Sequence, residues 1–257
     1  MVDEFDSSAE MNQSPLFALG FLATTLPAWG GPPFATDDPE PVEYRHWEVY
    51  FASQYAHGPD GTAGTLPHLE VNYGLVPNLQ IHLIAPAAFA APAEGSRHYG
   101  YGDTELGAKY RFVEETDLRP QIGVFPLVEL ATGDSQRGLG GGHTQVFLPV
   151  WLQKSSGPWV TYGGGGYWIN PGADNRNWWF MGWLIQRQLR PGLAVGVEVF
   201  HETAQSVGGR SDTKMNIGVT WDLSETRHLL ASFGPVLQGA SGYQAYFAFQ
   251  LTLRPGQ

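Results

Sequence analysis

Residues 102–112 have the sequence GDTELGAKYRF, in which residues suited to lipid alternate with polar or charged ones. Successive side chains of a β-strand point to opposite faces. One face of such a strand would carry Thr104, Leu106, Ala108, Tyr110 and Phe112. The other face would carry Glu105, Gly107, Lys109 and Arg111. Three charges on one face are unfavourable in a soluble core but suit a membrane barrel with a wet lumen, so this segment predicts a transmembrane strand.

The same alternation recurs almost to the end of the chain, in segments close to the length that crosses a bilayer when tilted, about 9 to 11 residues. We predict about 12 strands, an even number, as in bacterial outer-membrane barrels. They are residues 47–55, 66–73, 79–87, 102–112, 121–131, 144–154, 159–168, 178–189, 193–202, 214–222, 229–237 and 243–253. The predicted fold class is all-β, a single antiparallel transmembrane β-barrel.

The connections between these strands alternate between tight and long. The tight ones are residues 74–78, 113–120, 155–158, 190–192 and 223–228. The long ones are residues 56–65, 88–101, 132–143, 169–177 and 203–213, with 238–242 as a shorter last member. Outer-membrane barrels have short periplasmic turns and longer extracellular loops. We therefore predict a bacterial outer-membrane location with both termini in the periplasm, and outer-membrane lipid and lipopolysaccharide as surroundings.

The composition of the 257-residue chain excludes several functions. Its 14 Lys and Arg residues against 25 Asp and Glu residues give a net charge of −11, which disfavours nucleic acid as a partner. It has no cysteine, so disulfides and thiol chemistry are excluded. After the N-terminal region, no apolar run reaches the roughly 18 residues of a helical membrane span.

The N-terminal region predicts a secretory signal. Residues 16–28, LFALGFLATTLPA, are apolar and end in small residues, although no Lys or Arg precedes them. The alternative is a short anchoring or buried segment. We divide the chain into an extension with signal peptide at 1–30, a periplasmic segment at 31–45 and the barrel at 46–257.

Aromatic residues near predicted strand ends are typical of the belts where a barrel meets the membrane interfaces. They include Trp47, Tyr55, Tyr73, Tyr110, Phe112, Trp168, Trp178, Trp179 and Trp221. In the strand at 159–168, the run Gly163–Gly166 indicates either a bend or a place where a ligand or an inward-folded segment packs closely.

Charged and imidazole side chains of inward parity are the candidate lumen and selectivity residues. They are Glu48, His68, Glu70, His82, Glu105, Lys109, Arg111, Glu129, Glu198 and Lys214. Two interpretations stay open: a network of ion pairs that fills the barrel, or a lining that selects a permeating solute. His68, Glu70 and His82 could share one face, but polar lumen residues commonly bond one another, so we predict no metal and no cofactor.

Four segments carry a resemblance to a known family. They are residues 31–54, the strand GYGDTELGAKYRF at 100–112, the stretch PLVELATGD at 126–134 and residues 147–170. They resemble bacterial outer-membrane proteins labelled "phenol meta-pathway degradation" or simply "transporter". The resemblance implies an outer-membrane barrel, and it supplies no agreed catalytic or binding residues.

Three functions follow from these observations. The first is a passive channel or uptake porin for small molecules, with aromatic or hydrophobic ones among the candidates and a polar, charged lumen. The second is a non-conducting barrel whose long loops or periplasmic segment bind a protein partner. The third, a lipid-modifying enzyme, lacks support because no Gly-x-Ser-x-Gly motif is present and no His is followed two residues later by Ser, so no catalytic residue is predicted.

Overall fold

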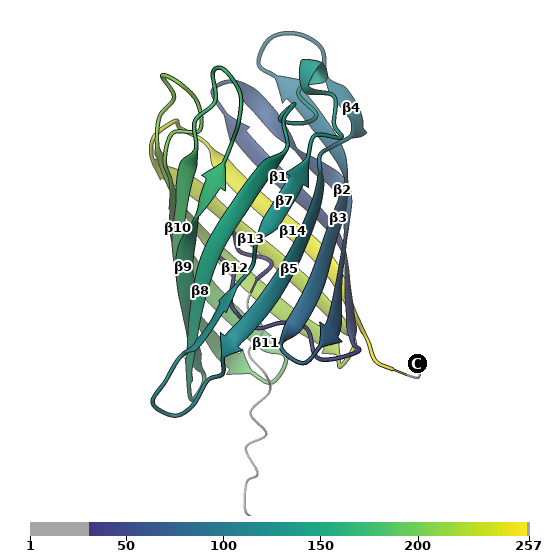
Figure 1. Ribbon diagram of the computed structural model, residues 1–257, viewed down its shortest axis with the longest axis vertical. Helices are drawn as coiled ribbons and strands as arrows, with labels where there is room; N and C mark the ends of the chain where they lie inside the picture. The colour runs from purple at the N-terminus through teal and green to yellow at the C-terminus, as the bar shows by residue number, and fades with distance from the viewer. Residues whose placement is uncertain (1–30, 256–257) are drawn as a thin grey trace, which may run out of the picture.

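A computed structural model describes residues 31–255. It is a closed antiparallel barrel of 12 strands (Figure 1). The strand segments are β1 Trp47–Gly58, β2 Gly61–Val76, β3 Leu79–Pro92, β4 His98–Tyr101, β5 Thr104–Val113, β6 Gln121–Val124, β7 Leu127–Leu130, β8 Gln145–Ser156, β9 Trp159–Ile169, β10 Trp178–Arg190, β11 Leu193–Glu202, β12 Asp212–Ser224, β13 Arg227–Gln238 and β14 Tyr243–Leu253. The ring closes because β1 pairs with both β2 and β14.

Two of the barrel strands are each made of two segments. β4 and β5 both pair with β3, and β6 and β7 both pair with β5 and β8. Phe125 and Pro126 separate β6 from β7, and a proline has no N–H to give to the ladder. The carbonyl of Pro126 still accepts from the Ala108 N–H at 3.2 Å. The interruption therefore bends one strand without opening the barrel.

The alternation of faces that the sequence predicts is present in the structure. In β10, buried and exposed side chains alternate for ten residues from Trp178. Its exposed residues are Trp179, Met181, Trp183 and Ile185, each about half exposed. Apolar side chains on the outer surface of a closed barrel are those that would face lipid. In β5, Leu106, Tyr110 and Phe112 are likewise exposed, whereas Lys109 is buried inside.

A charge on this outer surface gives a direct test of the membrane face. We expect Leu106→Arg to destabilise the barrel in lipid by about 2–4 kcal/mol, because Leu106 lies in the central part of its strand. The measurement is reversible urea unfolding in lipid vesicles. Glu105→Arg, which places the same side chain on the inner face, is the control, and equal losses for the two variants would contradict the assigned faces.

The loops partly differ from the prediction. Residues 56–65 were expected to form a long loop, which is wrong: β1 and β2 continue past the expected ends, and only Pro59 and Asp60 lie between them. The loop expected at residues 88–101 is also shorter than predicted, because β3 runs to Pro92 and β4 begins at His98. Long connections are present between β7 and β8, between β9 and β10, and between β11 and β12. One end of the barrel therefore carries the longer loops, and the other, with turns such as residues 77–78 and 157–158, is the short-turn end.

Residues 31–46, here called the inserted segment, lie inside the barrel rather than beyond its end (Figure 1, purple). Thr36 and Asp38 are fully buried there. The sequence did not predict this position. The signal peptide expected within residues 1–30 lies outside the described residues. Within residues 31–255, no helix is long and apolar enough to cross a membrane.

Candidate functional site: the barrel lumen

Glu198 on β11 holds the beginning of the inserted segment. Its two carboxylate oxygens accept the backbone N–H groups of Ala35 at 2.9 Å and Thr36 at 2.8 Å. The Nδ2 amide of Asn216 on β12 also donates to Glu198, at 2.6 Å. Glu198 has no solvent exposure, so these donors compensate for its burial. A side chain of the barrel wall thereby positions a stretch of backbone that belongs to no strand.

The acidic middle of the inserted segment pairs with two cations of β5. Lys109 Nζ lies 2.9 Å from Asp37 Oδ1 and 3.7 Å from Asp38 Oδ1. Arg111 Nη1 lies 3.8 Å from Glu40 Oε1. Lys109 also lies 5.0 Å from the centre of the Phe125 ring. Lys109 and Arg111, both predicted lumen residues, therefore direct their positive charges toward the inserted segment.

Glycines of inward parity leave the space that the inserted segment occupies. Gly196 and Gly218 are paired residues on β11 and β12. A Cβ atom on either would lie 2.8 Å or 2.6 Å from the ring of Phe34. A Cβ on Gly182 would collide with the Thr36 hydroxyl. These contacts explain why mid-strand glycines are placed here despite their cost in backbone entropy.

Amide side chains complete the attachment. Gln121 and Gln153 donate to Glu40 at 3.2 Å and 3.1 Å, and Gln80 accepts the Val42 N–H at 2.9 Å. The Ser232 hydroxyl donates to the Pro33 carbonyl. The inserted segment is thus bound along its length by side chains from several strands, and no covalent link holds it there apart from the chain itself.

Burial raises the pKa of the Asp38 carboxyl from its ordinary value of 3.8 to about 7, with Asp37 and Glu40 adding to the rise and Lys109 opposing it. Outside the barrel, Asp38 would regain its ordinary pKa. The inserted state therefore binds the proton more tightly, so insertion is favoured below the ordinary pKa and weakens as the pH rises through about 7.

We expect the inserted segment to leave its site more often at about pH 8 than at about pH 6. Because the chain has no cysteine, Val42→Cys provides a single buried thiol whose labelling by an impermeant maleimide reports departure. Leu118→Cys, at an almost fully exposed position, corrects for the intrinsic reactivity of thiols. The difference in corrected labelling rate between the two pH values should disappear when Asp38→Asn is added. If the difference persists in that variant, a group other than Asp38 causes it.

A polar network on β2, β3 and β5 lies next to the inserted segment. Asn72 receives a hydrogen bond from the Gln80 amide at 2.8 Å and donates to Glu70 at 2.8 Å. His82 lies with Nδ1 2.7 Å from Asn72 Oδ1 and Nε2 2.9 Å from Glu105 Oε1. This network joins three of the predicted lumen residues: Glu70, His82 and Glu105.

The other predicted residues lie apart from it. Glu48 accepts from the Tyr50 hydroxyl at 2.7 Å, and His68 Nδ1 lies 2.6 Å from the Thr65 hydroxyl. Glu129 faces inward opposite Glu105. Glu70 Oε1 lies 3.8 Å from His82 Nδ1, whereas His68 is hydrogen-bonded to Thr65. Within the described part of the chain, no group of three His, Cys, Asp or Glu side chains is arranged to hold a metal ion.

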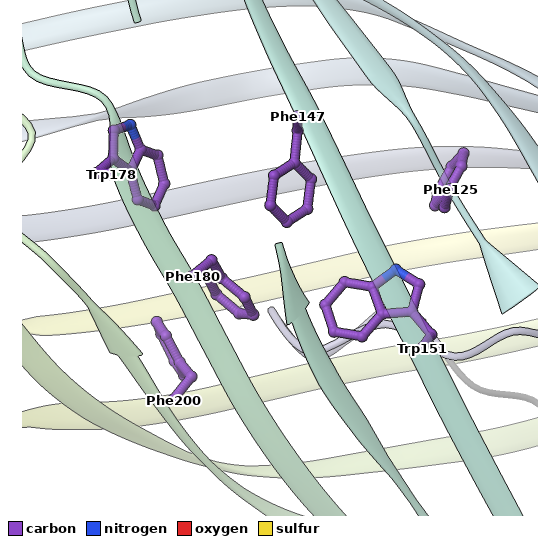
Figure 2. Packing of buried hydrophobic residues seen from close by; sticks show 6 residues of the cluster. All are labelled: Phe125, Phe147, Trp151, Trp178, Phe180 and Phe200. Carbon is purple, nitrogen blue, oxygen red and sulfur yellow. The ribbon is translucent and has the colours of Figure 1, made fainter. Parts of the chain in front are cut away.

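An aromatic wall forms the rest of the lumen (Figure 2). Its members are Phe125, Phe147, Trp151, Trp178, Phe180 and Phe200. Trp168 packs against it and stacks on Trp178, with ring centroids 5.3 Å apart. Trp168 and Trp178 were predicted to lie in a membrane-interface belt, which is wrong because both side chains face inward, whereas Trp179 is exposed outside.

The glycine run Gly163–Gly166 belongs to this wall. A Cβ on Gly164 would lie 3.1 Å from the Trp151 ring, and one on Gly166 would lie 2.6 Å from the Phe147 ring. On the outer face, a Cβ on Gly163 would collide with the Trp183 ring. The glycines therefore allow large aromatic residues to pack on both faces of β9.

A vestibule leads from the long-loop end to the inserted segment. Its outer cavity, of about 540 Å³, is lined by residues such as His57, His98 and Arg137. Its inner cavity, of about 410 Å³, shares Lys214 and other lining residues with the outer one. Pro33, Phe34 and Ala35 line the inner cavity, and Ala35 is exposed there. The inserted segment is thus the floor of the vestibule.

Beyond this floor, an enclosed cavity of about 60 Å³ separates the inserted segment from the wall formed by β1, β2, β3 and β5. Carboxylates from both sides line it, among them Asp37, Glu40, Glu48 and Glu70, and Lys109 is the cation among them. The short-turn half of the lumen is therefore acidic and narrow.

Sequence reasoning missed the inserted segment and the aromatic wall. The signals were present: glycines of inward parity at 182, 196 and 218, and two adjacent aspartates in a chain whose inward cations had no assigned partners. Likewise, Phe147, Trp151, Phe180 and Phe200 have inward parity within the predicted strands. Parity assigns a face, however, and does not say which side chains meet across the barrel.

Comparison with known proteins places this fold. No protein-family model matches the chain, and no curated protein matches it. An outer membrane channel from Pseudomonas putida F1 is similar in structure, with a TM-score of 0.67, 15% identity, and 84% of this chain and 98% of that one covered.

Two porins are similar to a lesser degree. The KdgM porin, solved in complex with disordered oligogalacturonate, gives a TM-score of 0.57 at 9% identity, covering 79% of this chain and 98% of that one. The NanC porin gives 0.54 at 7% identity with the same coverage. At these identities the likeness concerns architecture, and the chain has the fold of outer-membrane channel and porin barrels.

Proposed function

We propose that this protein is a passive outer-membrane channel for small molecules, closed in the state seen here by its own inserted segment. The observation that carries the proposal is that the floor of the vestibule is a segment bound inside the barrel, not a part of the barrel wall. Displacement of residues 31–46 would therefore connect the two ends of the lumen without breaking any strand pairing.

Three features support the finer parts of the proposal. The aromatic wall suits aromatic or hydrophobic solutes, as the resemblance to the "phenol meta-pathway" family implies. We assign the short-turn end, where β14 ends, to the periplasm, so the inserted segment would fill the periplasmic half of the lumen. Lipid and lipopolysaccharide would surround the apolar outer face. We retain 1–30, 31–45 and 46–257 as the divisions of the chain.

The alternative is a non-conducting barrel that binds a protein partner through its long loops or its periplasmic segment. The dense attachment of the inserted segment favours this reading, because both of its ends are hydrogen-bonded to the wall. The lipid-modifying enzyme has less support, since the similar structures named above are channels and porins.

Currents through the purified protein in planar bilayers test the proposal. We expect discrete openings carried mainly by cations, because the inward carboxylates near the floor outnumber Lys109 and Arg111. Solute entry measured by liposome swelling should then favour uncharged molecules and cations over anions. Currents equal to those of bare lipid, both for the whole chain and for a folded variant without residues 31–44, would favour the non-conducting barrel.

A further inference from the structure

The inner cavity of the vestibule is electrically balanced. The charged residues that line it are Glu202 and Lys214, from β11 and β12. Lys214 Nζ donates to Glu202 Oε2 at 2.6 Å, so the two charges neutralise each other. A charged solute would have to displace one partner or give up its own hydration without compensation. The cavity therefore favours a molecule without net charge.

Polar groups on one side of this cavity have unused hydrogen-bonding capacity. Gln244 Nε2 donates to Asn216 Oδ1 at 2.8 Å and to the Met215 carbonyl at 3.1 Å, which orients its Oε1. Within residues 31–255, neither this Oε1 nor the side-chain amide of the exposed Gln54 has a hydrogen-bond partner, and both residues line the cavity. Both groups are therefore free to donate hydrogen bonds to, or accept them from, a solute in the cavity.

Apolar surface faces these polar groups. Phe200 of the aromatic wall and Phe34 of the inserted segment both line the inner cavity. Lys214 Nζ lies 5.7 Å from the centre of the Phe200 ring, next to its ion pair with Glu202. The cavity volume of about 410 Å³ lies in the range of small-molecule sites, which combine apolar walls with a few placed polar groups.

From these features we infer that the inner cavity is a binding site for a small uncharged ring compound with one apolar face and hydroxyl groups at its edge. The apolar face lies against Phe200 and Phe34, and the hydroxyl groups bond to Gln244 and Gln54. This inference rests on the proposed channel function, because it names the class of solute that would enter. Both an aromatic alcohol and a sugar ring have this chemistry.

Equilibrium binding tests the inference separately from transport. Calorimetric titration of the purified full chain in detergent would use para-hydroxybenzyl alcohol, its anionic analogue para-hydroxybenzoate, its cationic analogue para-hydroxybenzylamine, and methyl glucoside. We expect an uncharged probe to bind and both charged analogues to bind at least about tenfold more weakly, owing to the cost of an unpaired buried charge. The alcohol and the glucoside distinguish the two sources of the ring. Since no current is needed, failure of the channel proposal would leave this result intact.

Three substitutions sharpen the test. Gln54→Leu removes one side-chain amide from the cavity and should weaken binding of the uncharged probe by about five- to tenfold, whereas Tyr110→Phe at a lipid-facing position should have no effect. Glu202→Gln leaves Lys214 without its counter-charge and should make para-hydroxybenzoate the preferred probe. Lys214→Met should instead favour para-hydroxybenzylamine, because Glu202 then lacks its cation.

Equal affinity of the wild-type chain for charged and uncharged probes would overturn the inference. So would unchanged affinity in Gln54→Leu, or an unchanged charge preference in Glu202→Gln and Lys214→Met when both variants retain the barrel fold by circular dichroism. Absence of binding by both uncharged probes would overturn the assigned class of ligand.

Discussion

Deleting residues 31–44 is expected to raise the single-channel conductance several-fold and to replace brief openings by a steady open state. The deleted residues include Pro33, Phe34 and Ala35, which form the floor of the vestibule, and the acidic residues that contact Lys109. A barrel of 12 strands is wider than the eight-stranded barrels that side chains alone can fill, so its lumen should be open without the segment. Current recordings in planar bilayers measure the change.

A full-length variant tests the same point without a deletion. Gly218→Leu places a side chain where the Phe34 ring lies and should expel the inserted segment, with a similar gain in conductance. Gly58→Leu is the matched control, because a Cβ there meets no atom closer than 3.9 Å. The deletion variant and Gly218→Leu must both fold, as judged by circular dichroism and gel mobility. If neither then conducts more than the wild type, the inserted segment does not close the channel.

Substitution of Lys109 by methionine is expected to have the second largest effect. Lys109 is buried and compensates for Asp37 and Asp38, so its loss leaves two carboxylates in a poorly hydrated site. Breaking a buried ion pair in this way costs about 3–5 kcal/mol. Because the segment can leave the barrel, we expect this cost to appear as departure of the segment, with faster labelling of Val42→Cys and larger currents.

A compensating change separates this effect from general damage to the barrel. Adding Asp37→Asn and Asp38→Asn to Lys109→Met removes the uncompensated charges and should restore slow labelling of Val42→Cys. Lys154→Met, which breaks a 2.6 Å pair with Glu115 at a half-exposed site, should leave labelling unchanged. Slow labelling in Lys109→Met itself would show that Glu198 and the amides suffice to hold the segment.

The strands and their faces could be predicted because they depend on local pattern. A period of two residues places Leu106 and Lys109 on opposite faces wherever the strand lies in the barrel. The bounds of β11 and β14 agree with the prediction, and most others differ by a few residues. The loop expected at residues 56–65 failed because Thr62 and Ala63 pair with residues of β1 and β3 outside the predicted strands. Such pairing adds strand length that no local turn signal reveals.

The lumen candidates could be predicted as inward residues, but their partners could not. Glu198 was identified by its parity, whereas its bonds to Ala35 and Thr36 join residues 163 and 162 positions apart in the chain. The sequence pattern identifies Phe147 and Phe180 as inward-facing residues, but their contact across β9 depends on the glycines between them. These contacts exist only once the sheet has closed.

The sequence by itself therefore determined a closed antiparallel barrel with an apolar outside and a polar, charged inside, because alternation acts residue by residue along each strand. Only the tertiary structure decided that residues 31–46 fill part of the lumen and that aromatic side chains form one of its walls. The physical reason is that Asp37 and Asp38 need the charge of Lys109 to be buried, and Phe34 needs the space left by Gly196 and Gly218. These residues come together around the inserted segment only when the barrel closes.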